Sequence, residues 1–206
     1  MQNLDRAASA MLDSARSLLD AVRQGESFVR RTVGGAAGGA ALSPTTEPQP
    51  RSGLEPQDVA AIADYTGAGF EEINPMLRGQ TPLDVDIMIR SAALSRALAK
   101  LPNHRGTVVR GRDLATAEVA FYDPGSIVRE PGFTSSDTSR PFPGNTIFYI
   151  ESKTGKDVSE FSTYGAAAGG KEHEVLFDAG TRFLVQFNDI VDGNRVILME
   201  EVVDRG

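Results

Sequence analysis

The chain has 206 residues, of which 40% are hydrophobic and 24% charged, a composition typical of a soluble globular protein. This length allows one full domain and a smaller appendage. The net charge of −7 disfavours non-specific binding to nucleic acid or to an anionic membrane surface. The absence of cysteine excludes disulfides, and with only two histidines we expect no metal site. No run reaches the ~20 apolar residues that a membrane-spanning helix needs.

Residues 1–33 are predicted to form an amphipathic helix. Apolar side chains recur at steps of three and four residues, at Leu4, Ala8, Met11, Ala15, Leu18 and Val22. An isolated helix of this length is marginal in water, so we expect it to dock on a partner, a chaperone or the main domain. Its polar face mixes Asp with Arg, which weakens a membrane-surface role without removing it. The N-terminus lacks the continuous apolar core of a secretory signal.

Residues 34–53 are rich in Gly, Ala, Ser, Thr and Pro and have no periodicity. Such a composition cannot bury a core, so this segment is predicted to be a flexible linker. The remaining residues, 54–206, are expected to form the main domain.

Residues 54–101 have the pattern of helices. A first helix should begin near Pro56 and stop at Gly67, and a second should be kinked or broken at Pro75 and end at Gly79. A third should begin with Thr81 as its cap and end before Pro102.

From residue 105 onward the sequence consists of short β-rich runs, and Asp192-Gly193 marks a hairpin turn between the last two. The runs predicted to be strands are 106–111, 125–128, 132–136, 145–152, 173–178, 181–189 and 195–203. Helices followed by strands predict an α+β fold instead of an alternating parallel sheet. Neither a Gly-x-Gly-x-x-Gly motif nor a Walker loop is found, so Rossmann and phosphate-loop folds have no support.

The stretch "KEHEVLF" places two acids, Glu172 and Glu174, in front of an apolar strand. If the strand alternation extends over them, both carboxylates face the same side, roughly 7 Å apart. They would repel each other unless a cation, a proton or solvent relieves the charge. On these residues alone, one interpretation is a charged edge strand that discourages aggregation.

Three motifs in order give a more specific interpretation. They are "TVVRG" with Arg110 at a strand end, "GFTSSD" with Ser135 and Ser136, and the Glu-His-Glu of residues 172–174. Together they resemble the arginine-specific mono-ADP-ribosyltransferase toxins, whose signature is an aromatic-Arg strand, a Ser-Thr-Ser strand and a Glu-x-Glu strand. The resemblance covers about residues 58–203, and includes "DYTG" and "NPMLRG", which are similar to that family's helical lobe.

The resemblance implies a fold in which an N-terminal helical lobe packs on a core of two small β-sheets, with NAD+ as the substrate between them. It implies that Glu174 stabilises the oxocarbenium-like transition state as nicotinamide leaves, and that Glu172 orients and deprotonates the acceptor guanidinium. Ser135 would hold Glu174. The expected NAD+ contacts are made by Arg110, Gly111, Ser135, Arg140 and Phe142.

The sequence also departs from the family signature. Val109 stands where the family has an aromatic residue, and Asp137 stands in place of the second serine. Tyr164 lies ten residues before Glu174, about twice the usual spacing of the family's substrate-facing aromatic, so its part in recognition is open.

The resemblance implies transfer of ADP-ribose to an arginine of a target protein. It further implies a bacterial toxin or effector that is secreted or delivered into a target cell without a signal peptide, with an immunity or secretion partner possible at the N-terminal helix. Alternatives are an NAD+ glycohydrolase, for which Glu172 would be superfluous, and an inactive binding module of the same fold. A glycosidase is a more distant alternative, because a chain without tryptophan is poorly supplied with sugar-stacking aromatics.

Overall fold

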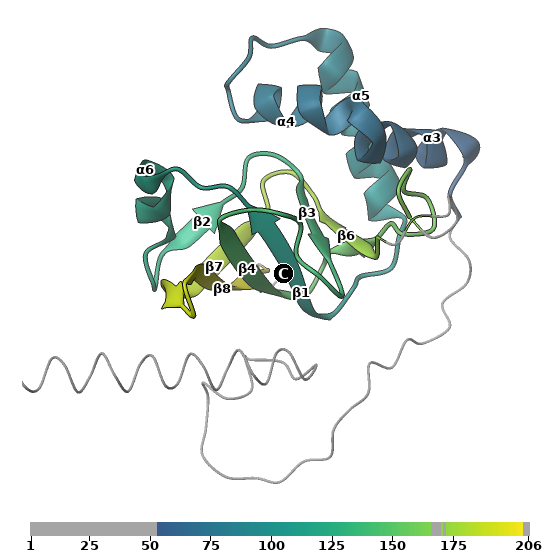
Figure 1. Cartoon of the computed structure of the whole chain (residues 1–206). Helices are drawn as coiled ribbons and strands as arrows, with labels where there is room; N and C mark the ends of the chain where they lie inside the picture. The colour runs from purple at the N-terminus through teal and green to yellow at the C-terminus, as the bar shows by residue number, and fades with distance from the viewer. Residues whose placement is uncertain (1–52, 166–169, 171, 204–206) are drawn as a thin grey trace, which may run out of the picture.

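The computed structural model describes residues 53–165, 170 and 172–203. The helix predicted over 1–33 and all but the last residue of the predicted linker lie outside this part of the chain. Helices come first and strands follow, so the predicted α+β class is confirmed, and Figure 1 shows the helices of residues 56–99 gathered on one side of the sheet. No helix in the described ranges is long and apolar enough to cross a membrane.

The helical lobe begins with α3 (Pro56–Asp64), which continues through a π-helical turn, η1 (Tyr65–Gly69), into α4 (Phe70–Leu77). The expected stop at Gly67 is wrong, because the backbone does not turn left-handed there, and a chain without such a residue can stay helical. The left-handed residue that ends this helical run is Gly79, with φ of 69°, as predicted. Pro75 is accommodated inside α4.

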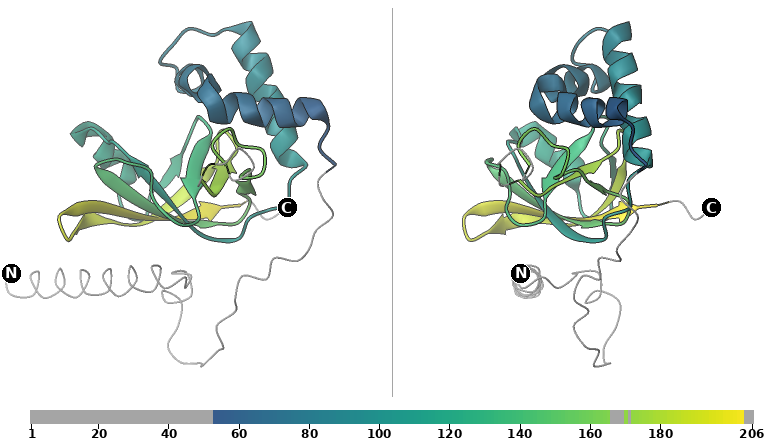
Figure 2. Two further views of the ribbon diagram at one scale, coloured as in Figure 1. Left: turned by 45° about the vertical axis from the view of Figure 1, so that its right-hand side comes forward. Right: turned by 90° about the vertical axis from the view of Figure 1, so that its right-hand side faces the viewer.

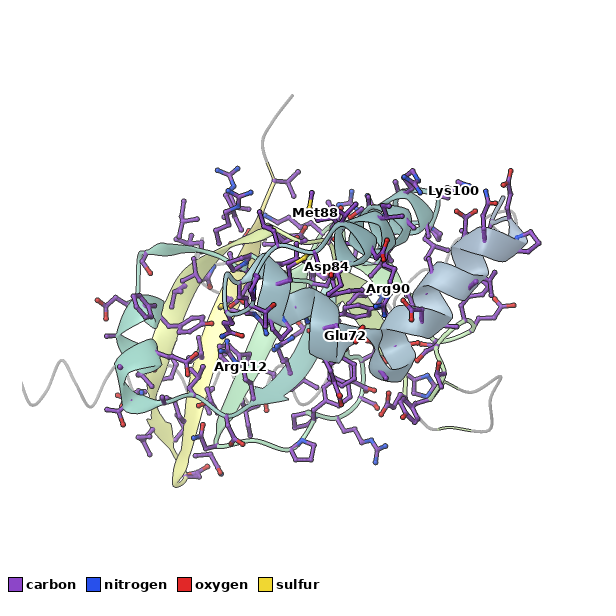
Figure 3. The ribbon with its side chains drawn as sticks, turned by 90° about the horizontal axis from the view of Figure 1, so that it is seen from above. Glu72, Asp84, Met88, Arg90, Lys100 and Arg112 are labelled. Atoms are coloured by element: carbon purple, nitrogen blue, oxygen red, sulfur yellow. The ribbon has the colours of Figure 1, made fainter. Side chains whose placement is uncertain are left out.

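The third helix, α5 (Val85–Ala99), begins later than predicted. Its N-cap is Asp84 and not Thr81, since the carboxylate of Asp84 accepts hydrogen bonds from the backbone N–H groups of Asp86 (2.9 Å) and Ile87 (3.1 Å). Arg90 of α5 forms ion pairs with the two preceding helices, with Asp64 of α3 at 2.9 Å and with Glu72 of α4 at 2.5 Å. Arg90 and Glu72 are labelled in Figure 3.

Eight strands form a single sheet in the order β2-β7-β8-β4-β1-β3-β6-β5. Seven of them match predicted runs, and the two-residue β5 and the short helical segments that precede β2 were not predicted. The strands are β1 (Gly106–Arg112), β2 (Ile127–Arg129), β3 (Thr134–Asp137), β4 (Thr146–Ser152), β5 (Lys156–Asp157), β6 (Glu174–Phe177), β7 (Arg182–Val191) and β8 (Asn194–Val202). The helical segments are α6 (Thr116–Val119) and the 3₁₀ turn η2 (Ala120–Tyr122). Asp192 and Gly193 have φ of 51° and 82°, as the predicted hairpin turn between β7 and β8 requires.

The expected division into two separate small sheets is replaced by two halves of one sheet. β2, β7, β8, β4 and β1 form one half, and β3, β6 and β5 form the other. The halves meet through one recorded register pair, Val109 with Asp137, whereas β1 and β4 pair over seven residues. This single pair keeps the hydrogen-bonded strand order continuous from one half to the other.

Two of the hydrophobic cores lie on opposite faces of β6. Val175 and Phe177 belong to the core inside the larger half of the sheet. Phe133 and Leu176 belong to the core under the helical lobe, where they join Ile62, Tyr65, Ile73, Leu94 and Leu98. Side chains two residues apart on a strand share a face, so Ser135 and Glu174 lie on the same face as Leu176, which packs in the core under the helical lobe. Figure 2 shows the helical lobe and the sheet from two sides.

Candidate active site

Glu174 is the first residue of β6, and its side chain is 4% exposed. β6 lies between β3 and β5, so it is an interior strand. The interpretation of this stretch as a charged edge strand is therefore wrong, because the acid at its start is buried and the strand is paired on both sides.

Two serines hold the Glu174 carboxylate, one at each oxygen. Ser135 Oγ donates to Oε1 at 2.5 Å, and Ser162 Oγ donates to Oε2 at 3.2 Å. Ser135 is directly opposite Leu176 across the β3–β6 pair, which brings it within reach of Glu174 on the same face. The carboxylate is therefore fixed in orientation from two separate segments.

Burial raises the pKa of Glu174 above its ordinary value. The hydrogen bonds from Ser135 and Ser162 act in the opposite direction, and the negative charges of Glu172 and Asp137 raise the pKa further. Burial and the negative charges of neighbouring acids disfavour the ionised carboxylate, so a positive charge placed beside it is strongly stabilising. This is the electrostatic requirement of a group that stabilises a cation.

Glu172 lies two residues before β6, in an isolated bridge with Gly165, and is half-buried. His173, between the two acids, is exposed. Glu172 is thus more accessible than Glu174, as a group that meets a second substrate needs to be.

Arg110 lies on β1, and its Nη1 donates to the backbone oxygen of Ser135 at 2.8 Å. Burial lowers the pKa of Arg110, and the carboxylate of Glu130 raises it. Glu130 is itself buried and accepts a hydrogen bond from Tyr122 Oη at 2.6 Å. Arg110 and Glu174 are therefore connected through one residue, because Ser135 accepts from the arginine and donates to the glutamate.

The loop between β3 and β4 passes directly over the end of β1. A Cβ added to Gly111 would lie 1.5 Å from the backbone oxygen of Phe142, and one added to Gly144 would lie 2.5 Å from backbone atoms of Arg112. Only glycine permits such close approach at position 111. Gly111 therefore permits the loop that carries Arg140, which is exposed, and Phe142, which is half-buried, to pack against the end of β1.

Asn74 on α4 joins the helical lobe to the start of β3. Its Oδ1 accepts from the N–H of Phe133 at 2.9 Å, and its Nδ2 donates to the Tyr65 hydroxyl at 2.9 Å. Phe133 packs edge-on against Tyr65 with ring centroids 5.2 Å apart. These contacts fix the lobe only two residues before Ser135.

Residues 158–165 connect the same lobe to Glu174. The N–H of Thr163 donates to Thr66 Oγ1 at 3.0 Å, and Thr163 Oγ1 donates to the backbone oxygen of Ala63 at 2.8 Å. Ser162 and Tyr164 stand on either side of this anchor, with Ser162 buried against Glu174 and Tyr164 54% exposed. A loop held in this way presents an exposed aromatic two residues after the serine that binds the buried acid.

The structure thus links Arg110, Ser135 and Glu174 by direct hydrogen bonds, with Gly111 next to Arg110 on β1. Glu172, Arg140 and Phe142 lie on the adjoining segments. Ser162 was not predicted, because a serine in a Gly/Ala-rich loop has no periodicity or spacing that ties it to Glu174. Asn74 and Tyr65 fall in motifs that carried the resemblance, but their link to Phe133 depends on tertiary structure. Within the described ranges, no three metal-ligating side chains come together.

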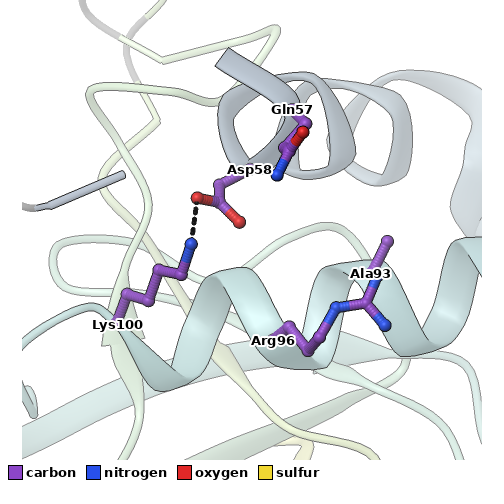
Figure 4. Close-up of a pocket in the computed structure, with 5 residues that line it drawn as sticks. All are labelled: Gln57, Asp58, Ala93, Arg96 and Lys100. Atoms are coloured by element: carbon purple, nitrogen blue, oxygen red, sulfur yellow. Dashed lines mark hydrogen bonds and ion pairs between the residues drawn. The ribbon is translucent and has the colours of Figure 1, made fainter. Parts of the chain in front are cut away.

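A hollow of about 460 Å³ lies elsewhere, between α3 and α5 (Figure 4). Lys100 and Asp58 form an ion pair of 2.6 Å across it, and hydrogen bonding to Lys100 lowers the pKa of Asp58. None of the residues that line it is predicted to take part in the chemistry. The lining residues are Gln57, Asp58, Ala93, Arg96 and Lys100.

Comparison with known sequences gives close relatives, although no protein-family model matches the chain. The chain is 44% identical over 138 residues to Mav of Mycobacterium avium (strain 104), whose name as an NAD(+)–arginine ADP-ribosyltransferase is provisional. It is 35% identical over 162 residues to the NAD(+)–protein-arginine ADP-ribosyltransferase Tre1 of Pseudomonas putida (strain GB-1). The matches cover 64% and 77% of this chain, but only 16% of Mav and 31% of Tre1.

Solved structures show the same fold. The type III effector XopAI of Xanthomonas axonopodis pv. citri superimposes with a TM-score of 0.63 and 24% identity, over 71% of this chain and 66% of that one. The ADP-ribosyltransferase Vis of Vibrio splendidus, in complex with agmatine, gives a TM-score of 0.60 and 23% identity, over 74% of this chain and 77% of that one. The solved structures show that the fold is that of ADP-ribosyltransferases. The sequence relatives show that the matched part of the chain belongs to the arginine-specific ADP-ribosyltransferase family.

Proposed function

We propose that this protein transfers ADP-ribose from NAD+ to an arginine side chain of a target protein and releases nicotinamide. The observation that carries the proposal is the buried Glu174 carboxylate, held by Ser135 at one oxygen and Ser162 at the other, with Arg110 bound to the same Ser135. The names of Mav and Tre1, which both specify NAD+ and arginine, support the same reaction.

In this proposal Glu174 acts when the bond between the ribose anomeric carbon and nicotinamide breaks. The bonding electrons go to the nicotinamide ring, which leaves neutral, and positive charge develops on the ribose. A carboxylate already fixed beside that carbon gains interaction energy as the charge develops, so it stabilises the transition state more than the ground state. Because Glu174 is buried, its attraction to the positive charge on the ribose is stronger than it would be in water.

Glu172 then serves the acceptor. A guanidinium nitrogen forms a bond to the anomeric carbon and loses one proton, and Glu172 is the base that takes it. Arg110 binds NAD+ phosphate oxygens with its forked guanidinium. Arg140 adds a second cationic contact, and Phe142 packs on nicotinamide, from the loop that Gly111 admits.

The bacterial relatives support a role as a toxin or effector delivered into a target cell, since XopAI is described as a type III effector. Residues 1–33 are proposed to bind a chaperone, an immunity protein or a secretion partner. A protein bearing an accessible arginine is the proposed acceptor. The exposure of Tyr164, two residues after Ser162, supports a proposed contact between this tyrosine and the acceptor protein. The chain spans a third or less of the length of Mav and Tre1, so these roles concern the part of such proteins that it matches.

NAD+ glycohydrolysis is the second candidate, and one experiment separates the two. Nicotinamide release is measured with and without agmatine, a small arginine analogue, for wild type, Glu174→Gln and Glu172→Gln. Transfer predicts that Glu174→Gln loses both reactions by about 10² to 10⁴-fold, while Glu172→Gln loses mainly the agmatine-dependent reaction. A wild type that hydrolyses NAD+ but never modifies agmatine or a protein would be a glycohydrolase, and full activity in Glu174→Gln would refute both candidates.

A further inference from the structure

Asp137 ends β3 at the point where three strands meet. Its backbone pairs with Val109 of β1 on one side and with Glu174 of β6 on the other. Its side chain is only 1% exposed. A carboxylate so deeply buried, directly opposite Glu174, is unfavourable unless hydrogen bonds compensate for the lost hydration.

Both carboxylate oxygens of Asp137 are occupied. Oδ1 accepts from the N–H of Ser139 (2.7 Å), the hydroxyl of Ser139 (2.7 Å) and the N–H of Arg140 (3.0 Å). Oδ2 accepts from the N–H of His173 at 2.9 Å. One oxygen therefore fixes the turn that leads into the Phe142 loop, and the other fixes the residue between Glu172 and Glu174.

These bonds also determine the charge of Asp137. Burial alone would raise the pKa of Asp137, but the bonds from Ser139, His173 and Arg140 together hold it below its ordinary value. The group is therefore ionised at neutral pH and can accept from all four donors at once. A serine in its place has one short side-chain oxygen and cannot serve both segments.

Glu172 and Glu174 depend to different degrees on the hydrogen bond between the His173 N–H and Asp137. Glu174 is held by Ser135, by Ser162 and by its place in β6. Glu172 lies outside the strand, and the backbone next to it is held through His173, whose N–H binds Asp137 and whose C=O accepts from the N–H of Thr138 at 3.1 Å. Loss of the Asp137 bond should therefore displace Glu172 more than Glu174.

We propose that Asp137 is a positioning residue that holds the segment carrying Glu172 and so favours transfer to the acceptor over hydrolysis. This inference rests on the proposed function, in which Glu172 serves only the acceptor. The Asp137 carboxylate thus joins the loop that carries Phe142 to the segment that carries Glu172 and Glu174.

The test uses Asp137→Asn in the full chain. The amide oxygen can keep the three contacts to Ser139 and Arg140, but the amide nitrogen then meets the N–H of His173 and cannot accept from it. We expect transfer to agmatine to fall about tenfold or more, because a small displacement of a reacting group is costly, while nicotinamide release without acceptor stays within about twofold. Exchange of the His173 amide hydrogen should accelerate about tenfold or more as its acceptor is lost.

Ser136→Ala is the matched control, since Ser136 is adjacent and buried, and its hydroxyl has no hydrogen-bond partner in the described structure. It should leave both reactions and the His173 exchange unchanged. An equal fall of transfer and hydrolysis in Asp137→Asn, unchanged transfer, or unchanged His173 exchange would each overturn the inference. If Asp137→Asn does not fold, Asp137→Ser tests the same bond with the same expected split. A wild type without detectable nicotinamide release refutes the proposed function instead, and the exchange measurement still decides whether Asp137 holds His173.

Discussion

Val109 and Asp137 are direct cross-strand partners, and theirs is the one register pair recorded between β1 and β3. Both are positions where the sequence departs from the family signature, which has an aromatic residue and a serine there. The two departures therefore meet where the two halves of the sheet join. Val109 is 7% exposed and Asp137 is 1% exposed with four hydrogen bonds, so the pair is an integrated part of the fold. These departures consequently give no support to the alternative of a decayed, inactive module.

The pH dependence of nicotinamide release should report the pKa of Glu174. The reaction needs the ionised carboxylate, so activity should fall on the acid side, with a midpoint above that of an ordinary glutamate because burial raises the pKa. Ser162→Ala removes a hydrogen bond that lowers this pKa, so its acid limb should move to higher pH. Glu172→Gln removes a negative charge that raises it, so its acid limb should move to lower pH.

The measurement is the rate of nicotinamide release without acceptor between about pH 4 and 8, the range in which a shifted glutamate titrates. Ser159→Ala is the control for Ser162→Ala, because Ser159 is in the same loop and its buried hydroxyl has no partner in the described structure. Shifts of the same sign in Ser162→Ala and Glu172→Gln would show that the acid limb belongs to another group.

Gly111→Ala should displace the Phe142 loop. The new Cβ would lie 1.5 Å from the backbone oxygen of Phe142. The three nearest atoms all belong to the Phe142 backbone, so no flexible side chain can move aside to relieve the clash. We expect a loss of ~1–3 kcal/mol of unfolding free energy, as for other overpacked sites, together with weaker NAD+ binding. Chemical denaturation and calorimetry with NAD+ measure the two effects.

Gly67→Ala provides a matched control in the helical lobe. The nearest atom to its added Cβ would be Thr163 Oγ1 at 3.4 Å, an ordinary contact. Stability and NAD+ affinity should therefore stay close to those of wild type. If Gly111→Ala binds NAD+ as tightly as Gly67→Ala does, the loop over β1 is not part of the NAD+ site.

The contrast between Ser135 and Ser162 shows what could be predicted from the sequence. Ser135 lies on a strand, where alternation fixes the face of its side chain, and in a motif of defined order, so its contact with Glu174 was expected. Ser162 reaches the same carboxylate from a loop, and its position depends on Thr163 being anchored to Thr66 almost one hundred residues earlier in the chain. Periodicity cannot reveal such an anchor, because it depends on tertiary contacts.

The helix boundaries follow the same reasoning. Gly79 was correctly predicted as a helix end, because its left-handed backbone favours glycine. Gly67 does not have a left-handed backbone, and the atoms nearest to an added Cβ there belong to Thr163. Thr81 and Asp84 are both good capping residues, and the choice between them was settled by the carboxylate of Asp84 reaching two N–H groups. The union of the two predicted sheets through Val109 and Asp137 involves a single pair, too little to leave a pattern in the sequence.

Glu174→Gln should change how stability depends on pH. The pKa of Glu174 is raised in the folded state, so the folded protein binds this proton more tightly than the unfolded chain does. Stability therefore falls as pH rises from the ordinary pKa of a glutamate to the raised value, and this penalty remains at higher pH. Glutamine cannot ionise, so Glu174→Gln should gain stability relative to wild type across that window.

Urea denaturation of both proteins at several pH values measures this difference, and subtracting the two curves removes the contribution of the other acids. Glutamine can still accept from Ser135, so the variant tests charge with little change of shape. A difference that does not vary with pH would mean that the carboxylate of Glu174 is not destabilised by its burial.

Removing residues 1–53 should leave the chemistry intact. The contacts described for the site involve no residue before Leu54, which packs against the core under the helical lobe, and α3 has its own N-cap in Glu55. A shortened chain that starts at Leu54 should therefore unfold cooperatively and transfer ADP-ribose to agmatine at a rate within about twofold of the full chain, since it keeps Arg110, Ser135, Glu172 and Glu174. Its modification of a protein in intact target cells should fall sharply if residues 1–33 serve delivery or partner binding. A shortened chain that folds cooperatively but has lost transfer to agmatine would place part of the catalytic machinery before Leu54. Unimpaired modification in intact cells would instead remove the proposed delivery role of the N-terminal segment.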